Sequence, residues 1–325
     1  MQGSNEMTRF IKIASVFVLA VSLASTATAE YPEREIQLIV PTSAGGGSDK
    51  TARVYAKFVT EYLGQPVVVV NRPGGGGAIG ITAVLNAKPD GYTMGQLMLP
   101  EIVSRQFDNP TAQFGADSFD YIGKSGIDNH IFAVRNDSKL QTYQDMVAFA
   151  KANPGNLSCG VTGVGGGPQL ASLRWQKLAG VELNLVSFKG GGQIRGALLG
   201  GHIDMLCANT GAVSKVLKEV RILALSADET HPKFPNVPTL KSLGIDLAVG
   251  TERILAMPKG TPTKILEKLR AAHQKTLANP EYQKAAKKAK VTIDTASPEK
   301  IAQMLKSEEN DYQALWAASP WIQDR

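Results

Sequence analysis

The sequence predicts an α/β protein built from two domains with parallel sheets. From Ile36 onward, short apolar runs typical of strands alternate with helical segments in both halves of the chain. Apolar strands that alternate with helices imply βαβ units with right-handed crossovers. The length of 325 residues is too great for one small domain and fits two domains of ordinary size.

The alternation is regular in each half. The first half is expected to form strands at Ile36–Val40, Val67–Val70 and Tyr92–Leu99, with helices at Ser48–Tyr62 and Ala78–Ala87. The second half is expected to form strands at Asn156–Val161, Glu182–Phe188, Ile203–Cys207 and Arg221–Ser226, with helices between them.

The domain boundaries are indicated by the segments that join the halves. Phe119–Gly123, Ile131–Arg135 and Thr251–Met257 are strand-like, and three helical segments follow them: Pro262–Leu277, Glu281–Lys288 and Pro298–Trp316. The late helices have only Val291–Asp294 as a strand-like run among them, so they must pack on an existing sheet. We therefore expect a discontinuous first domain (residues 30–130 and 251–325), an inserted second domain (131–250), and a hinge.

The N-terminus has the features of a secretory signal peptide. Arg9 and Lys12 precede the apolar run Ile13–Leu23, and the small residues Ala27-Thr28-Ala29 follow. The run is too short to span a bilayer, which needs about 20 apolar residues. A buried N-terminal helix is the alternative, but the flanks favour a signal peptide of residues 1–29 and export to the periplasm.

Composition and motifs argue against several classes of protein. Losing Arg9, Lys12 and Glu6 changes the net charge from +6 to +5, and the remaining basic residues are dispersed, unlike those of a nucleic-acid binder. No Walker, H-E-x-x-H or G-x-S-x-G motif occurs. No histidine or cysteine has metal-ligand spacing: His130, His202, His231, His273, Cys159 and Cys207. Buried free thiols and a disulfide both remain open for the cysteines, and no catalytic or metal site is expected.

Three loops rich in small residues directly follow predicted strands. They are Pro41–Asp49, Thr162–Pro168 and Lys189–Gly192. Glycine lets a ligand approach the backbone closely, and the following helix adds free N–H donors and the positive end of its dipole. Flexible turns would explain one such loop. Three at the carboxyl ends of strands, spread over both domains, predict a shared anion-binding cleft.

A fourth glycine run raises a different interpretation. Gly75, Gly77 and Gly80 satisfy G-x-G-x-x-G after a strand, and Glu101 follows at a spacing typical of a dinucleotide site. The run follows the second strand, however, whereas that fingerprint belongs to the first. After the first strand, Lys50 stands where the third glycine is needed.

Several motifs, taken in order, resemble the tripartite tricarboxylate transporter substrate-binding receptors, known as the Bug or TctC family. The similarity covers essentially the whole chain after the leader. The motifs are Tyr31-Pro32, Ile39-Val40-Pro41, Gly45–Asp49, Ala52-Arg53, Gly64–Val69, Asn71–Gly74, Pro89–Thr93, Leu198–Asp204, Pro235–Thr239 and Ala256–Pro262.

The resemblance implies a type II periplasmic-binding-protein fold, in which two α/β domains close on a ligand. It implies a carboxylate held mainly by backbone amides in the interdomain cleft. The residues that carry this role over are Thr42, Ser43, Ala44, Gly45, Gly46, Gly47 and Asp49; Thr162, Gly163, Gly165, Gly166, Gly167 and Gln169; and Lys189, Gly190, Gly191 and Asn209. For Asp49, stabilising the N-terminus of its own helix is an equal alternative.

The resemblance also implies a two-component membrane permease as partner. Because catalytic motifs are missing, no cofactor and no catalytic activity are expected, and a monomer suits a diffusing receptor. Gly166–Gln169 and Ala208 depart from the polar residues common in the family. Glu101 is expected to be either a ligand-selecting carboxylate, for a donor group such as an amine, or a solvated loop residue. A secreted enzyme with a nucleotide site at Gly75–Gly80 and a ligand sensor for a membrane signalling receptor are the alternative functions.

Overall fold

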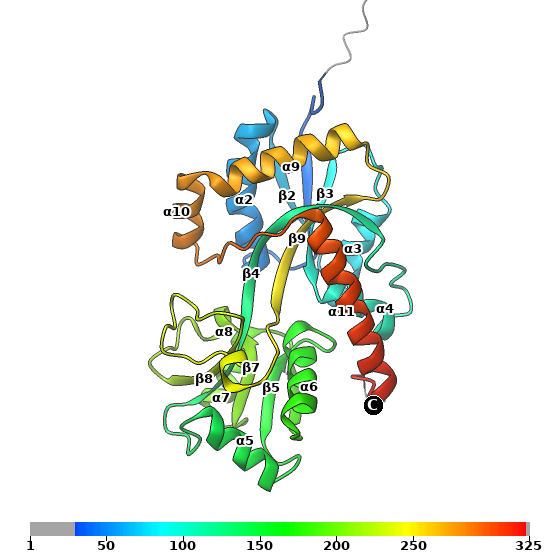
Figure 1. The fold of residues 1–325 in the computed structure, drawn as a ribbon. Helices are drawn as coiled ribbons and strands as arrows, with labels where there is room; N and C mark the ends of the chain where they lie inside the picture. Colours follow the sequence, from blue (N-terminus) through cyan, green and yellow to red (C-terminus); the bar gives the residue numbers. More distant parts are fainter. Residues whose placement is uncertain (1–29, 323–325) are drawn as a thin grey trace, which may run out of the picture. The chain divides into compact units, whose positions relative to one another are not determined.

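The structure is a computed structural model that describes residues 30–322. The expected signal peptide, residues 1–29, lies outside the described residues. From Arg34 onward the chain forms one compact unit, whose fold is shown in Figure 1. Within the part that the structure describes, no helix is both long and apolar enough to cross a membrane.

Nine strands of the described chain form one mixed sheet in the order β2-β1-β3-β9-β4-β7-β5-β6, with β8 also paired to β4. The strands are β1 (Ile36–Val40), β2 (Val67–Asn71), β3 (Thr93–Leu99), β4 (Phe119–Arg135), β5 (Ser158–Thr162), β6 (Asn184–Phe188), β7 (Met205–Asn209), β8 (Val220–Ser226) and β9 (Gly250–Pro258).

Helices follow most strands, as the alternation predicts. They are α2 (Gly47–Leu63), α3 (Ala78–Leu85), α4 (Glu101–Asp108), α5 (Tyr143–Ala152), α6 (Gly167–Ala179), α7 (Gly191–Leu199), α8 (Thr210–Val213), α9 (Thr263–Ala278), α10 (Pro280–Lys288) and α11 (Pro298–Ala318), with 3-10 turns η1 (Gly75–Gly77) and η2 (Lys241–Leu243). Apart from three runs discussed below, the predicted strands and helices are confirmed, with ends that differ by at most two residues.

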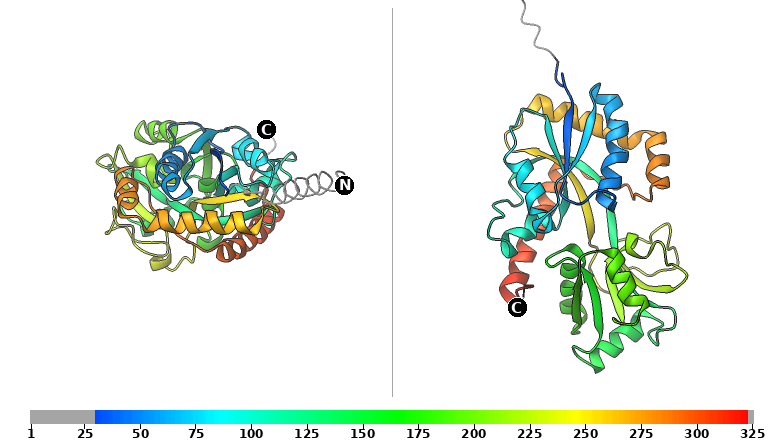
Figure 2. Two further views of the ribbon diagram at one scale, coloured as in Figure 1. Left: turned by 90° about the horizontal axis from the view of Figure 1, so that it is seen from above. Right: turned by 180° about the vertical axis from the view of Figure 1, so that it is seen from behind.

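The long strand β4 joins two sections of the sheet (Figure 2). Phe119–Asn129 pairs with β9 in a first section that also contains β1, β2 and β3. His130–Arg135 pairs with β7 and β8 in a second section, completed by β5 and β6. The pairs of β4 and β9 are antiparallel, so the expectation of purely parallel sheets is wrong for the strands that join the sections.

Phe119–Gly123 and Ile131–Arg135 are strands, as expected, but they are parts of one strand. The glycine-rich and polar stretch between them still pairs with β9 across two register shifts. The expectation for the third run is wrong. Val291–Asp294 is not a strand. Only Thr292 forms a bridge, with Ile127, and its carbonyl oxygen would lie 2.6 Å from a Cβ atom on Gly126.

The apolar cores lie on the faces of the two sections. Successive residues of a strand point to opposite faces, and on β4 Phe132 and Val134 join one buried cluster while Ile131 and Ala133 join another. The first of these clusters contains Cys159 and Cys207, which are buried free thiols. Of the two alternatives left open for the cysteines, the structure therefore has free thiols.

A buried ion cluster joins β4 and β9 to the segment between α10 and α11. The ammonium of Lys124 on β4 lies 2.7 Å from a carboxylate oxygen of Glu252 on β9 and 2.6 Å from one of Asp294. Burial raises the pKa of Glu252, and the charge of Lys124 opposes that shift. Removing one partner of a buried pair leaves the other charge uncompensated, which is strongly destabilising.

We therefore predict that Lys124→Met lowers the free energy of unfolding by about 3 kcal/mol, measured by urea denaturation. Lys259→Met is the matched control, because Lys259 is largely exposed and lies 3.5 Å from Asp120. It should change stability by less than about 0.5 kcal/mol. Equal effects of the two substitutions would show that the cluster does not stabilise the joining segments.

Candidate functional site

A cavity of about 1010 Å³ lies where the loops after β1, β5, β6 and β7 meet. Residues of β4 and β9 also line it. These residues and the loop after β1 belong to the first section of the sheet and the loops after β5, β6 and β7 to the second, so both sections contribute to its wall. These loops follow the carboxyl ends of their strands, the position at which α/β proteins bind ligands.

The loop after β1 presents the N-terminus of α2 to the cavity. Gly46 is the N-cap residue, and no side chain of the described chain caps this helix. Asn71 donates a hydrogen bond to the Thr42 carbonyl oxygen at 3.0 Å, which holds the start of the loop in place. The first N–H groups of a helix have no partner within it, so this turn offers donors to a ligand.

Asp49 serves its own helix rather than the cavity. Its carboxylate accepts hydrogen bonds from the Gly45 N–H at 2.8 Å and from Arg53 at 3.1 Å. Burial alone would raise the pKa of Asp49, but these bonds hold it below its ordinary value. Of the two roles considered for Asp49, the geometry is that of the helix-stabilising one.

The loops after β5 and β6 repeat the arrangement of the first. Gly166 and Gly190 are the N-cap residues of α6 and α7, and neither described helix has a side-chain cap. Gln169 accepts a hydrogen bond from the Gly165 N–H at 2.6 Å and donates one to the Trp321 carbonyl oxygen at 3.3 Å. Gln169 therefore links the loop after β5 to Trp321 and supports this loop from outside the cavity lining.

Most of the residues expected from the sequence line this one cavity. They are Thr42, Ser43, Ala44, Gly46, Gly47, Thr162, Gly163, Gly166, Gly167, Lys189, Gly190, Gly191 and Asn209. Gly45, Asp49, Gly165 and Gln169 are not among its lining residues.

The sequence analysis did not single out the polar residues that β4 and β9 supply. Asp128, Thr251 and Arg253 line the cavity, together with Thr210 at the start of α8. The sequence did contain a signal for these residues, because Asp128 and Arg253 are charged and lie in segments that connect the two predicted domains. Because attention fell on loops at strand ends, side chains from the middle of the connecting strands were missed.

The charged residues around the cavity are mainly basic. Seven of its lining residues are basic and two are acidic: Lys50, Arg105, Lys189, Arg195, Lys233, Arg253 and Lys290, with Glu101 and Asp128. A cleft lined with an excess of one sign of charge concentrates ligands of the opposite sign. Within residues 30–322, no group of three or more histidine, cysteine or acidic side chains could hold a metal ion.

Glu101 is not a solvated loop residue. It is the first residue of α4 and lines the cavity, and its Oε2 atom is buried without a hydrogen-bond partner in the described structure. Burial raises the pKa of Glu101 to about 7, with the charge of Arg105 opposing the shift. A substantial fraction of this carboxyl is therefore protonated at neutral pH.

The glycine run at Gly75–Gly80 has a packing role. A Cβ atom on Gly80 would lie 2.6 Å from Cα of Pro41, so glycine there lets α3 pack against the first cavity loop. Gly76 and Gly77 have φ of 62° and 98° and line the cavity. Glycine adopts such angles without the strain that other residues suffer.

Comparison with known proteins identifies the family. A model of the tripartite tricarboxylate transporter family receptor matches residues 51–318. This chain belongs to that family. Protein BugT of Bordetella pertussis is 32% identical over 278 residues, covering 80% of this chain and 82% of BugT. A Cupriavidus necator protein of the gbd 5′ region is 34% identical over 275 residues, covering 83% of each chain.

Solved structures of other receptors have the same fold. A TctC solute-binding protein from Polaromonas has a TM-score of 0.78 and 31% identity, covering 89% of this chain and 99% of that one. MatC from Rhodopseudomonas palustris, solved with bound malate, has a TM-score of 0.74 and 25% identity, covering 88% of this chain and 99% of MatC. The predicted periplasmic-binding-protein fold and the family resemblance are thus confirmed, and the family is one of solute-binding receptors.

We predict that Gly165 is required for packing rather than for ligand contact. A Cβ atom there would lie 1.9 Å from Oδ2 of Asp108, an oxygen that also accepts a hydrogen bond from the Trp321 indole. Gly180→Ala is the matched control, because Gly180 has φ of 63° against 62° for Gly165 and open space around it.

Gly180→Ala should cost about 1–2 kcal/mol of unfolding free energy from its left-handed backbone alone. Gly165→Ala should cost about 1–3 kcal/mol more because of the additional clash. Urea denaturation of both variants measures the difference, and equal costs would contradict the packing role.

Proposed function

We propose that this receptor captures a small carboxylate-bearing ligand, mainly through backbone N–H groups. The observation that carries the proposal is the convergence of three uncapped helix N-termini, those of α2, α6 and α7, on one cavity from both sections of the sheet. A carboxylate that loses water needs several donors, and helix N-termini supply both donors and positive potential. The malate bound to MatC is consistent with this ligand class.

The two sections belong to two lobes that close on the ligand about a hinge. The first lobe comprises residues 30–130 and 251–325, and the second comprises residues 131–250. The exchange of partners along β4 after Asn129 and the start of β9 at Gly250 support these boundaries. A ligand that contacts both lobes binds the closed state better and therefore shifts the population toward it.

The receptor acts after export and passes its ligand to a membrane permease. Residues 1–29 serve as the signal peptide, and the mature protein works as a periplasmic monomer. Family membership supports a two-component permease as the partner.

The protein binds its ligand without chemical change. Burial raises the pKa of Cys207 to about 12 and lowers that of His130 to about 4. These groups are therefore a protonated thiol and a neutral imidazole at neutral pH, and neither lines the cavity. Their states suit a packed interior rather than a nucleophile and its base.

The test is a thermal-shift and calorimetry screen of protein refolded after complete unfolding, which removes any retained ligand. Mono-, di- and tricarboxylates, amino acids, aromatic acids and nucleotides are the probes. A true ligand at one hundred times its Kd should stabilise the fold by about 2.7 kcal/mol. Stabilisation by a carboxylate supports the proposal, whereas stabilisation by nucleotides alone contradicts it.

Gly46→Val should abolish this binding while the protein remains folded. The backbone at Gly46 has φ of −75°, which valine accepts, and the nearest atom to an added Cβ is the Ser43 carbonyl oxygen at 3.5 Å. The bulk of valine would instead occupy the approach to the α2 donors. Gly196→Val is the control, because Gly196 lies in open space away from the cavity. Unchanged affinity of the Gly46 variant, measured by calorimetry, would contradict backbone binding.

A further inference from the structure

Arg253 is a buried cation with few partners. The residue is 4% exposed, and its Nε atom has no hydrogen-bond partner in the described structure. It lies on β9, at the wall of the cavity. A Cβ atom on Gly47 would lie 3.4 Å from its Nη2 atom, so the guanidinium is beside the first turn of α2.

Asp128 compensates the positive charge at this position only in part, because the ion pair that it forms with Arg253 is long. The N-terminus of a helix carries about half a positive charge, and arginine stays protonated in proteins. Burial lowers the pKa of Arg253, and the charge of Asp128 opposes that shift. Arg253 and α2 therefore form a site that needs an anion.

Asp128 is the anion nearest to this site, but it does not complete it. Its Oδ2 atom lies 3.9 Å from Nη2 of Arg253, which is beyond hydrogen-bond distance. Its Oδ1 atom accepts a hydrogen bond from the Thr210 hydroxyl at 2.5 Å. Asp128 also lines the cavity, and its side chain is 18% exposed. Its Oδ2 atom thus has capacity for a donor.

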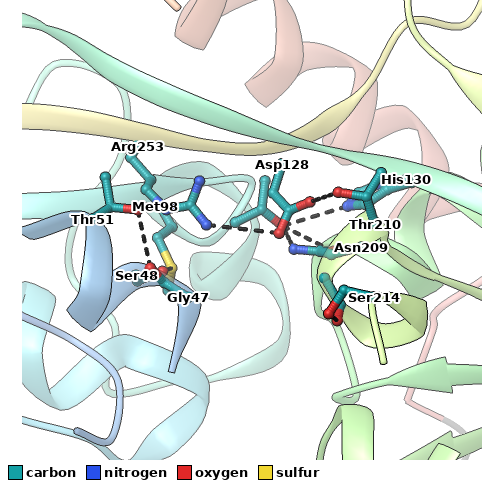
Figure 3. Close-up of polar contacts among 12 residues, drawn as sticks. Gly47, Ser48, Thr51, Met98, Asp128, His130, Asn209, Thr210, Ser214 and Arg253 are labelled. Carbon is teal, nitrogen blue, oxygen red and sulfur yellow. Dashed lines mark hydrogen bonds and ion pairs between the residues drawn. The ribbon is translucent and has the colours of Figure 1, made fainter. Parts of the chain in front are cut away.

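Neighbouring polar groups hold this arrangement in place (Figure 3). Asn209 donates a hydrogen bond to the Thr251 hydroxyl at 3.0 Å, and a ring nitrogen of His130 lies 3.4 Å from the same hydroxyl. Burial lowers the pKa of His130 to about 4, so at neutral pH it adds no positive charge here. Among the residues labelled in Figure 3, Asp128 and Arg253 are therefore the ones that carry a charge at neutral pH.

We propose that the ligand is an α-amino acid, with its carboxylate bound by Arg253 and the α2 N-terminus and its ammonium bound by Asp128. This assignment rests on the proposed function and specifies its ligand class. The charged atoms of Arg253 and Asp128 lie 3.9 Å apart. The carboxylate and the ammonium of an α-amino acid are attached to the same carbon atom, so one head group can contact both side chains. The zwitterion supplies the anion that Arg253 lacks and the donor that Oδ2 of Asp128 lacks.

Glu101 is the less suitable partner for an ammonium. Its pKa of about 7 leaves much of it neutral at neutral pH, and its Cγ atom would lie 3.9 Å from a Cβ atom on Gly77 in the fourth glycine run. The amine-selecting role considered for Glu101 therefore passes to Asp128.

The decisive experiment compares matched ligand pairs that differ only in the amine. The pairs are aspartate with succinate, glutamate with glutarate, leucine with 4-methylpentanoate, and phenylalanine with 3-phenylpropionate. Each compound is titrated calorimetrically into refolded full-length mature protein. Because a hydrogen bond to a charged group stabilises by about 1.5–3 kcal/mol, the amino acid of the best pair should bind about tenfold to hundredfold more tightly.

Variants assign the two charges. Asp128→Asn keeps an acceptor for Thr210 but removes the negative charge, so it should abolish the preference for the amine and leave the des-amino acid within about threefold. Arg253→Lys keeps the charge but loses the planar fork of donors, so it should weaken both members of a pair. Asp137→Asn and Arg135→Gln are the controls, because this ion pair lies at the surface. Urea midpoints check that each variant is folded.

The outcomes separate this inference from the function on which it rests. Preference for the amine that Asp128→Asn removes supports the inference. Binding of des-amino carboxylates without preference for the amine, or a preference that Asp128→Asn leaves unchanged, overturns it while the carboxylate receptor stands. Binding of no compound in any pair overturns the inference, and failure of the whole carboxylate screen overturns the receptor function as well.

Discussion

The antiparallel pairing of β4 with β9 is the constraint on which the site depends. β4 runs from one section of the sheet into the other, and β9 pairs with it along the first section. The two strands therefore form the junction beside which the loops after β1, β5 and β6 lie. The buried Lys124 ion cluster joins the same strands to the segment around Asp294. A cavity built on joining strands has walls from both sections, so closure about those strands would change the binding site directly.

The binding chemistry of the site depends on helix N-termini that have no side-chain caps. α2, α6 and α7 begin at glycines without side-chain caps, whereas α5 begins with a complete capping box at Thr142 and Asp145. Capping stabilises a helix by about 1 kcal/mol. The absence of caps where three described helices meet the cavity leaves their donors available to a ligand, at a cost in stability that a bound anion would offset.

The electrostatic arrangement adds selectivity to these general donors. Backbone N–H groups recognise an anion but do not distinguish one carboxylate from another. Arg253 and Asp128 are fixed on the joining strands and differ in charge, so they distinguish ligands by the groups beside the carboxylate. Buried charges that remain incompletely paired are costly, which is the physical reason for expecting a ligand to complete them.

Much of the fold could be predicted from the sequence because each element has a local signal. Ile36–Val40 is a run that is apolar except for Gln37, and the glycines after it indicate the start of α2. The continuity of β4 had no such signal, since Gly123, Gly126 and Asp128 disfavour a strand and only pairing with β9 makes one. The roles of Asp128 and Arg253 were missed for the same reason. Gly165 was expected to bind the ligand, but it does not line the cavity. A glycine is required there because of the contact with Asp108, which is distant in the sequence.

The most direct measurement of the central claim is an NMR titration of glycine-labelled protein with the carboxylate that binds it. The account predicts that the amide resonances of Gly46, Gly47 and Gly190 shift downfield as their N–H groups bind the ligand, while Gly196 and Gly244 do not move. Binding that leaves the three cavity amides unshifted would contradict a receptor that holds its ligand by the backbone at helix N-termini.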